Sequence, residues 1–444
     1  MGYQTNQTVK MNAPGKNSLI LQKARETLRQ SEALVDYLET HGIDEPNFTA
    51  SSPAHPADKK YDDICTDLSQ VAKDLILLAQ GPMRWLRIFF CSHHDLGAWQ
   101  AALRFGYFTN VPLNRPMMIQ DIASAARMDV DRTRRIMKLL ASQRCFQEVE
   151  EDVYEHTAMS AFIAQEGNIR SAMAFQAEEM FEASSLTAAS IAKEPFASHA
   201  TNSAFNLRFG TSPYQWFMAN PERGERFASA MAGLVQINRD TTEIRDRFPW
   251  ANLGNKTIVD VGGGSGHIAV YLATQFPGLK FIVQDINPLM LSQGPKLPDF
   301  IHVQNRVSFM RYDFFQPQPI DSAGLFFLRQ IAHNYPDDVC IKIFKNFVPA
   351  LEKCGPGTSL LLNDMVLPQA NTVPKVEEHL LRQLDMAMLN SYAAKQRTLK
   401  EFTKLLHEAD PRLEVVNVHG KGIMGLLEVQ LCQQRSQAAD VYRE

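Results

Sequence analysis

One stretch near the middle of the chain limits the fold more than any other, the segment KTIVDVGGGSGHIAVYLATQFPGLKFIVQD from Lys256 to Asp285. The β-branched run at 258–261 predicts a short strand, and the apolar residues of 267–275 recur at helical spacing. The turn between them holds Gly262, Gly263, Gly264 and Gly266. Because glycine lacks Cβ, such a turn can take positive φ and bring bare backbone close to a ligand.

Asp285 follows a second predicted strand, 281–284, and stands 19 residues after Gly266. An acidic side chain there can accept hydrogen bonds from ribose hydroxyls. A dinucleotide fingerprint, G-x-G-x-x-G, would need a third glycine where the chain has His267. The form D-V-G-G-G-S-G, with Asp260 just before the turn, instead resembles the first motif of S-adenosylmethionine-dependent methyltransferases. A glycine turn without a ligand is the remaining alternative.

The length and the net charge of the chain limit the classes of function that it can have. The 444 residues allow about two or three domains. With 45 basic and 49 acidic residues the net charge is -4, which creates no field to attract nucleic acid or an anionic membrane. No window reaches the ~18 apolar residues of a membrane span, and the N-terminus lacks the apolar core of a secretory signal. The six cysteines show neither zinc-site nor disulfide-framework spacing. We therefore expect a cytoplasmic protein whose partners are small molecules or proteins.

The N-terminal part is predicted to form two helices joined by a linker. Residues 19–41 form an amphipathic pattern that predicts a helix packed on a partner surface. The polar, proline-bearing segment 45–60 predicts disorder, and a second helix, 61–80, is expected to end before Gly81 and Pro82.

Residues 83–157 have the element order of a winged helix. Helices are expected around Trp99, from Ile119 and over 131–141, and a wing hairpin over 146–148 and 153–156. This order raises DNA binding as one hypothesis. Between Met117 and Thr157, however, six basic residues face eight acidic ones, so phosphate contacts would meet a net negative module.

The segment 160–247 is predicted to be helical. Phe227 and Met231 stand four residues apart and therefore share a helix face. They can belong to the core, or they can form a substrate wall together with Met388 from a later segment.

After Asp285, strands are expected at 307–312, 325–328 and 359–362, with a terminal hairpin over 414–418 and 426–432. The first three lead to Asp313, His333 and Asp364 respectively. In an open parallel sheet the carboxyl ends of the strands form the ligand crevice, so these side chains should converge on one rim.

Motifs in the same order identify a family resemblance. They are Q-D-I-A (120–123), Y-E-H-T (154–157), V-D-V-G-G-G-S-G, F-I-V-Q-D, Y-D-F-F (312–315), L-R-Q-I-A-H-N-Y (328–335), N-D-M-V-L-P (363–368) and K-Q-R-T (395–398). From about Phe105 to Leu431 the chain resembles the plant and fungal small-molecule O-methyltransferases of the caffeate and sterigmatocystin type.

This resemblance implies an α/β fold, in which a Rossmann-like methyltransferase sheet follows an all-helical, winged-helix dimerisation domain. The implied division is an N-terminal helix and linker (1–60), the winged-helix domain (61–160), a helical connector lining the substrate pocket (161–247) and the S-adenosylmethionine-binding domain (248–435). A homodimer, and methylation of a hydroxyl on an aromatic or polyketide-like metabolite, are implied with it.

The resemblance also implies residue roles. Gly262 and Gly263 would contact the cofactor through their backbone, Asp285 would bind its ribose, and Arg329 would replace a family lysine. Asp313 and Phe314 would face the adenine. His333 would be the general base, oriented by Asp364 and Gln396, and no metal is required. A phenol has a pKa near ~10, whereas an imidazole near ~6.5 can accept its proton at neutral pH.

Four positions depart from the family pattern. Asn334 stands for an aspartate, Tyr335 for a tryptophan, and Asp364 and Gln396 for glutamates. A glutamine can accept a hydrogen bond but offers no charge to stabilise an imidazolium. A second hypothesis is therefore a methyltransferase-like pericyclase or cyclase that binds the cofactor without methyl transfer, and His333 could then be purely structural.

Overall fold

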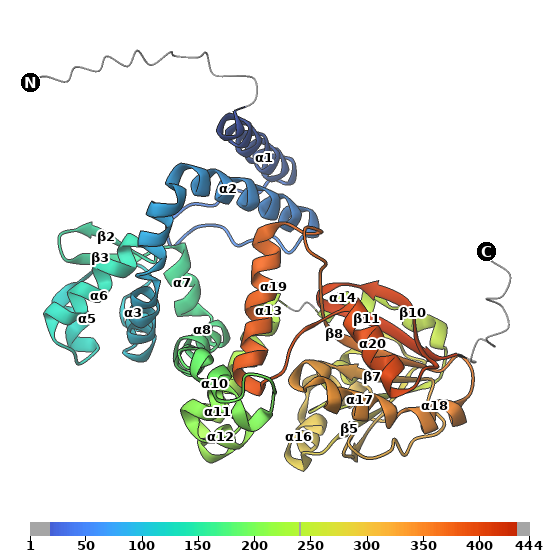
Figure 1. The fold of residues 1–444 in the computed structure, drawn as a ribbon. Coiled ribbons are helices and arrows are strands. Elements are labelled where there is room, and N and C mark those ends of the chain that lie inside the picture. The colour runs from blue at the N-terminus through green and yellow to red at the C-terminus, as the bar shows by residue number, and fades with distance from the viewer. Residues whose placement is uncertain (1–17, 239–240, 433–444) are drawn as a thin grey trace, which may run out of the picture. The chain divides into compact units, whose positions relative to one another are not determined.

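The computed structural model describes residues 18–238 and 241–432 and divides into two units (Figure 1). Unit 1 comprises Met1–Gln165 with Val373–Glu377, and unit 2 comprises Glu166–Thr372 with Glu378–Glu444. The first 17 residues of the predicted N-terminal segment, and residues 433–435 of the predicted catalytic domain, lie outside the described residues.

Unit 1 is built from helices and one small sheet. Its elements are α1 (Leu19–His41), α2 (Lys59–Phe89), α3 (Ser92–Arg104), α4 (Tyr107–Asn110), β1 (Met117–Met118), α5 (Ile119–Ala125), α6 (Val130–Ser142), β2 (Phe146–Glu150), β3 (Val153–His156) and α7 (Ala158–Gln165).

The helix predicted at 19–41 is present as α1. The C-terminal part of its apolar stripe packs on α2 of the same chain, where Tyr37 and Leu38 bury against Tyr61, whereas Leu21 and Leu28 are 39% and 59% exposed. A partner surface over this exposed part stays a prediction.

The helix end expected before Gly81 is confirmed. Within α2, Gly81 takes a non-helical conformation, φ +60° and ψ 175°, and a separate helical segment follows this kink to Phe89.

The predicted disorder of the linker 45–60 is wrong. Thr49 forms a β-bridge with Thr157, and the Ala158 N–H donates to the Phe48 carbonyl at 3.3 Å. The Arg144 guanidinium lies 4.3 Å from the centroid of the Phe48 ring. Main-chain pairing and a cation–π contact therefore fix a segment whose composition alone indicates flexibility.

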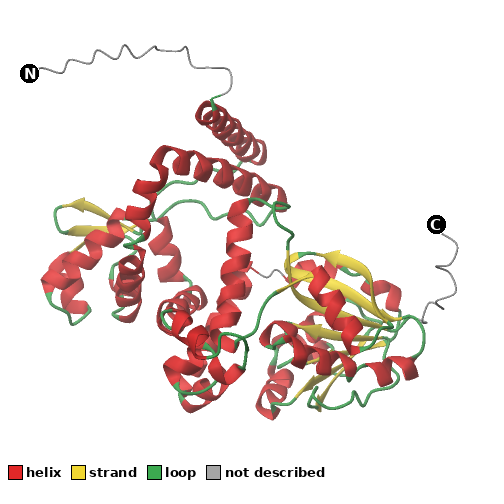
Figure 2. Ribbon diagram, in the orientation of Figure 1, coloured by secondary structure: helices red, strands yellow, loops and turns green. Residues whose placement is uncertain are grey.

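The winged helix is confirmed. The small sheet has the order β1-β3-β2, with the wing formed by the antiparallel pair β2 and β3, shown as yellow arrows in Figure 2. Arg134 and Lys138 of α6 pair with Asp152 and Glu148 of the wing at 2.9 and 3.0 Å. Two of the basic side chains that could meet DNA phosphates are thus engaged within the domain.

Unit 2 begins with helices, as the sequence predicts. They are α8 (Gly167–Phe175), the π-helical η1 (Gln176–Met180), α9 (Phe181–Ser184), α10 (Thr187–Lys193), the 3-10 turn η2 (Ala200–Asn202), α11 (Ala204–Phe209), α12 (Pro213–Ala219), α13 (Pro221–Asn238) and α14 (Thr241–Arg247).

A mixed sheet with flanking helices completes unit 2. Its strands are β4 (Thr257–Val261), β5 (Lys280–Asp285), β6 (Val307–Arg311), β7 (Leu325–Arg329), β8 (Ser359–Leu367), β9 (Arg397–Thr398), β10 (Leu413–Gly420) and β11 (Gly422–Leu431). Between and around them lie the helices and 3-10 turns η3 (Trp250–Leu253), α15 (His267–Gln275), α16 (Pro288–Gln293), η4 (Gly294–Lys296), η5 (Pro298–His302), η6 (Ala332–Asn334), α17 (Asp337–Lys345), α18 (Val348–Cys354), α19 (Lys375–Tyr392) and α20 (Leu399–Ala409).

The strand order is β10-β11-β8-β7-β4-β5-β6, with the short β9 paired to β8. The order reverses at β4, whose parallel neighbours are β5 and β7, so the glycine turn stands at the topological switch point where ligands bind in such sheets. The antiparallel hairpin β10-β11 is confirmed at the other edge.

Two apolar clusters cover the two faces of the sheet. Val259 packs with α17, α18 and α20 on one face. Ile258, its neighbour in β4, packs with α14 and α15 on the other. Alternation along the strand thus buries both faces and leaves the polar side chains to collect where the strands end.

Candidate active site

The glycine turn leaves no room for side chains. Gly262 has φ +71°, and a Cβ on it would lie 2.6 Å from Ile331 Cδ1. A Cβ on Gly263 would lie 2.5 Å from Asp260 Oδ2. Both N–H groups donate to the Gln284 carbonyl, at 2.8 and 3.1 Å, which ties the turn to β5. Their N–H groups are therefore used internally, and the Gly263 carbonyl also accepts the Gly266 N–H at 2.9 Å. The predicted backbone contact of Gly262 and Gly263 with the cofactor stays a prediction.

Asp285 lies at the end of β5, half-buried and held by two backbone donors. Its Oδ2 accepts the Gly264 N–H at 3.0 Å, and its Oδ1 accepts the Asn287 N–H at 2.8 Å. A carboxylate oxygen has about two acceptor positions, so each oxygen keeps one for a hydroxyl. The carboxylate is thus set in place beside the glycine turn before any ligand arrives.

Asp260, which the sequence analysis noted but gave no role, is a buried acid directly under the turn. It is 3% exposed. Burial raises its pKa to about 7, Asp285 adds to this, and the positive charge of Arg329 acts in the opposite direction. Arg329, at the end of β7, also donates a hydrogen bond to Asn363 Oδ1. An acidic residue near the end of a buried strand, two residues before Gly262, was the signal that could have assigned a role to Asp260.

Asp313 and Phe314 follow β6 on the same rim. The Asp313 carboxylate accepts the Phe315 N–H at 3.0 Å. The Phe314 ring meets Tyr335 edge-on at 5.9 Å between centroids, and one of its carbons lies 3.7 Å from where a Cβ of Gly262 would be. Phe314 therefore borders the glycine turn and provides an aromatic surface suited to a flat heterocycle.

His333 and Asp364 form a tight pair. His333 Nδ1 lies 2.5 Å from Asp364 Oδ1, and the His333 backbone N–H donates to Oδ2 at 3.2 Å. Burial alone would raise the pKa of Asp364, but the charge and hydrogen bonds of His333 outweigh it and lower that pKa. An ionised acceptor at Nδ1 keeps the proton on Nδ1, so Nε2 carries the lone pair that can accept a proton.

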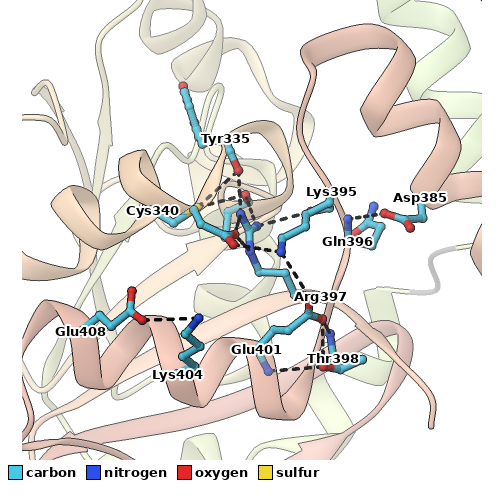
Figure 3. Close-up of polar contacts among 12 residues, drawn as sticks. Tyr335, Cys340, Asp385, Lys395, Gln396, Arg397, Thr398, Glu401, Lys404 and Glu408 are labelled. Atoms are coloured by element: carbon cyan, nitrogen blue, oxygen red, sulfur yellow. Dashed lines mark hydrogen bonds and ion pairs between the residues drawn. The ribbon is translucent and has the colours of Figure 1, made fainter. Parts of the chain in front are cut away.

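Gln396 is not joined to His333 by a hydrogen bond. Its backbone N–H donates to Asp385 Oδ1 at 2.7 Å (Figure 3). Its side chain is 6% exposed, and Oε1 has no hydrogen-bond partner within the described chain. Leaving such an acceptor unpaired costs about 1–3 kcal/mol.

Asn334, the other departure beside His333, donates to the Gln330 carbonyl at 3.0 Å. Gln330 itself has φ +56°, a conformation that is uncommon outside glycine. The change from aspartate therefore acts on the loop before His333 through this bond.

Two of the three candidate substrate residues, Phe227 and Met231, pack against one apolar cluster of unit 2, and Met388 is not among the residues that contact it. Phe227 stacks on Phe217 with centroids 4.3 Å apart, and Met231 packs against the same cluster. Met388 is half-buried in α19, where its neighbour Ala387 touches the cluster. Phe227 and Met231 are only partly buried although they pack against this core cluster. Their contacts are therefore compatible with a role in the core and with a role in a substrate wall.

Two tyrosines were missed from the sequence because neither belongs to a motif. Tyr214 of α12 and Tyr392 of α19 have ring centroids 5.6 Å apart. Burial raises the pKa of both hydroxyls, and the negative charge of Asp285 contributes at Tyr214. The charge of Asp285 thus acts on the hydroxyl of Tyr214, although about half of that residue is exposed.

Among the described residues, no group of three or more histidine, cysteine, aspartate or glutamate side chains could hold a metal ion. No helix within residues 18–238 and 241–432 is long and apolar enough to cross a membrane.

Comparisons with known proteins agree with this geometry. An O-methyltransferase domain profile matches residues 190–410, and an O-methyltransferase dimerisation domain profile matches residues 91–166. O-methyltransferase sol2 of Alternaria solani is 42% identical over 402 residues, covering 90% of this chain and 93% of that protein. The crystal structure of OxaC with SAH and oxaline has a TM-score of 0.74 at 20% identity, covering 93% and 98% of the two chains. A structure described as a pericyclic reaction enzyme reaches 0.69 at 18% identity, covering 92% and 100%.

Proposed function

The chain belongs to the S-adenosylmethionine-dependent O-methyltransferases of fungal secondary metabolism, and we propose that it methylates a phenolic hydroxyl of an aromatic or polyketide-like metabolite with His333 as general base. The observation that carries this proposal is the 2.5 Å contact between His333 Nδ1 and the ionised Asp364. A phenol with a pKa near ~10 is mostly protonated at neutral pH, so a positioned base increases its nucleophilicity.

Each residue of the proposed site has a role that follows from the chemistry of its side chain. Asp364 holds the Nδ1 proton, which leaves Nε2 of His333 to take the hydroxyl proton. Asp285 has the free acceptor positions for ribose hydroxyls, and Asp260, when ionised, favours a cation beside the glycine turn. Bound S-adenosylmethionine supplies a methyl group already activated by its sulfonium charge. Phe314 offers a ring face for the adenine.

His333→Ala tests the base directly in single-turnover methyl transfer at pH 7 and pH 9 with saturating cofactor. Turnover at pH 7 should fall by about 10²–10⁴-fold, the usual contribution of a positioned base. The rate should recover partly at pH 9, since solvent then ionises the phenol, and cofactor affinity should stay near that of the parent. His407→Ala, which removes a surface histidine paired with Glu414, is the matched control. Equal rates in His333→Ala and the parent would make the histidine structural.

A second candidate is a pericyclase or cyclase that binds the cofactor without methyl transfer. The unpaired amide of Gln396 favours it, since this position no longer supplies a charge for a protonated base. Tight cofactor binding by the parent, without transfer to any phenol in a broad panel, would support this alternative.

The proposal also covers the oligomeric state of the protein and its location in the cell. We infer a homodimer through unit 1, supported by the dimerisation profile and by exposed apolar side chains on α2 and directly after it, such as Met83 and Phe90, which are 79% and 65% exposed. We also infer a cytoplasmic enzyme, which fits six unpaired cysteines. The division into 1–60, 61–160, 161–247 and 248–435 stays our proposed functional organisation.

A further inference from the structure

Arg397 is a fully buried cation that the function described so far does not use. It is 0% exposed, yet its guanidinium donates five hydrogen bonds to four acceptors within unit 2, one of them from Nε to Asp337 Oδ1 at 3.0 Å (Figure 3). Nη1 donates to the Ala332 carbonyl at 2.8 Å and to the Lys395 carbonyl at 3.3 Å. Nη2 donates to the Tyr335 carbonyl and to Asp337 Oδ1, both at 2.8 Å.

Two of these acceptors bracket the proposed base. Ala332 opens the 3-10 turn η6, Tyr335 follows it, and His333 lies between them. A planar guanidinium presents several donors in a fixed arrangement, so one side chain can hold both carbonyls at once. Lysine, with a single ammonium on a flexible chain, cannot reproduce that arrangement.

A charged network holds Arg397 in turn. Asp337 also pairs with Lys395 at 2.9 Å, and Lys395 pairs with Glu401 at 3.2 Å. Glu401 closes the capping box of α20 by accepting the Thr398 N–H at 2.8 Å. Burial would raise the pKa of Asp337, but its bonds to Lys395 and Arg397 outweigh this and lower it. The turn before α20 is thereby joined to the loop that carries His333.

We propose that Arg397 is a positioning residue for the methyl transfer, acting through His333 by fixing the backbone on both sides of it. Asp364 orients the ring, and Arg397 fixes the turn from which the ring projects. This inference rests on the proposed function, because it assigns Arg397 an effect on a proton transfer by His333.

The decisive experiment is a double-mutant cycle of Arg397→Lys and His333→Ala in single-turnover methyl transfer. Alone, Arg397→Lys should lower the rate at pH 7 by about 10²-fold, as a base displaced by about 1 Å would, and recover partly at pH 9. In the His333→Ala background it should cost nothing further, because residues that act as a unit are not additive. Arg412→Lys, at a partly buried cluster with Asp410 and Glu352 whose ion pairs do not involve the His333 loop, is the control that should keep the parent rate.

An unchanged rate in folded Arg397→Lys, or a full further loss in the His333→Ala background, would overturn the inference. Should Arg397→Lys not fold, Asp337→Ala removes the carboxylate whose Oδ1 accepts from Nε and Nη2 of Arg397, and the same cycle applies to it. If the parent transfers no methyl group, the proposed function fails, and nitrogen-15 NMR of His333 tests the positioning separately. A hydrogen-bonded Nδ1 proton present in the parent and lost in the variant supports Arg397 as the positioning residue, whereas an unchanged signal refutes it.

Discussion

Replacing Asp285 by alanine is expected to weaken S-adenosylmethionine binding by more than about 10-fold. Each oxygen of the carboxylate accepts one backbone N–H, from Gly264 and from Asn287, and keeps a position for one ribose hydroxyl. A hydrogen bond to a charged group contributes about 1.5–3 kcal/mol. Since about 1.4 kcal/mol is a factor of ten, the loss of even one ribose bond predicts roughly a 10- to 150-fold higher Kd.

Isothermal titration calorimetry measures this change, with Asp285→Asn and Asp299→Ala beside it. The asparagine variant keeps one acceptor oxygen, so its affinity should lie between those of the parent and Asp285→Ala. Asp299 is an exposed acid of the same unit and should be neutral. Thermal unfolding of the cofactor-free proteins reports any loosening of the glycine turn separately. Unchanged affinity in a folded Asp285→Ala would refute the ribose assignment.

Two further predictions concern pH and assembly. Because burial raises the pKa of Asp260 to about 7, its stabilising contribution is present in acid and lost as pH rises through about 7, so Asp260→Asn should stabilise the free protein at pH 8 in thermal unfolding. The same variant should remove the decline in cofactor affinity that calorimetry should detect in the parent between pH 8 and pH 6, since only the ionised acid attracts the cationic cofactor. Light scattering should give a dimer for the parent at micromolar concentration, with an interface on the order of 2,000 Å². A charge at the exposed apolar Phe90 should dissociate it, whereas Val416→Asp on the edge strand β10 should not.

Local patterns allowed the core of the catalytic unit to be predicted from sequence. Helix α15 has the predicted bounds, 267–275, because its apolar spacing is uninterrupted between a glycine turn and a proline. Strands β4, β5 and β7 match because β-branched and aromatic runs end at polar residues. These signals depend only on neighbours in sequence, which is the information that a single chain provides.

Prediction from the sequence failed where contacts between residues far apart in the chain determine the local structure. The linker 45–60 has a flexible composition, yet Thr157, about a hundred residues away, pairs with it. Arg397 belongs to the K-Q-R-T motif, in which the sequence indicated a role only for Gln396. Only the fold shows that the guanidinium of Arg397 reaches the carbonyls on both sides of His333.

The departures from the family pattern differ in how they affect His333. Asp364 is shorter than the family glutamate, but it still contacts the ring of His333 at 2.5 Å and its backbone at 3.2 Å. Asn334 bonds to a loop carbonyl, so its missing charge is not taken from the ring. Gln396 is the one change that leaves a buried acceptor unpaired. A protein that merely binds the cofactor has no need for an ionised partner at Nδ1, whereas deprotonation of a hydroxyl does, because the partner stabilises the imidazolium that forms. The intact pair therefore favours methyl transfer with a base supported by one carboxylate.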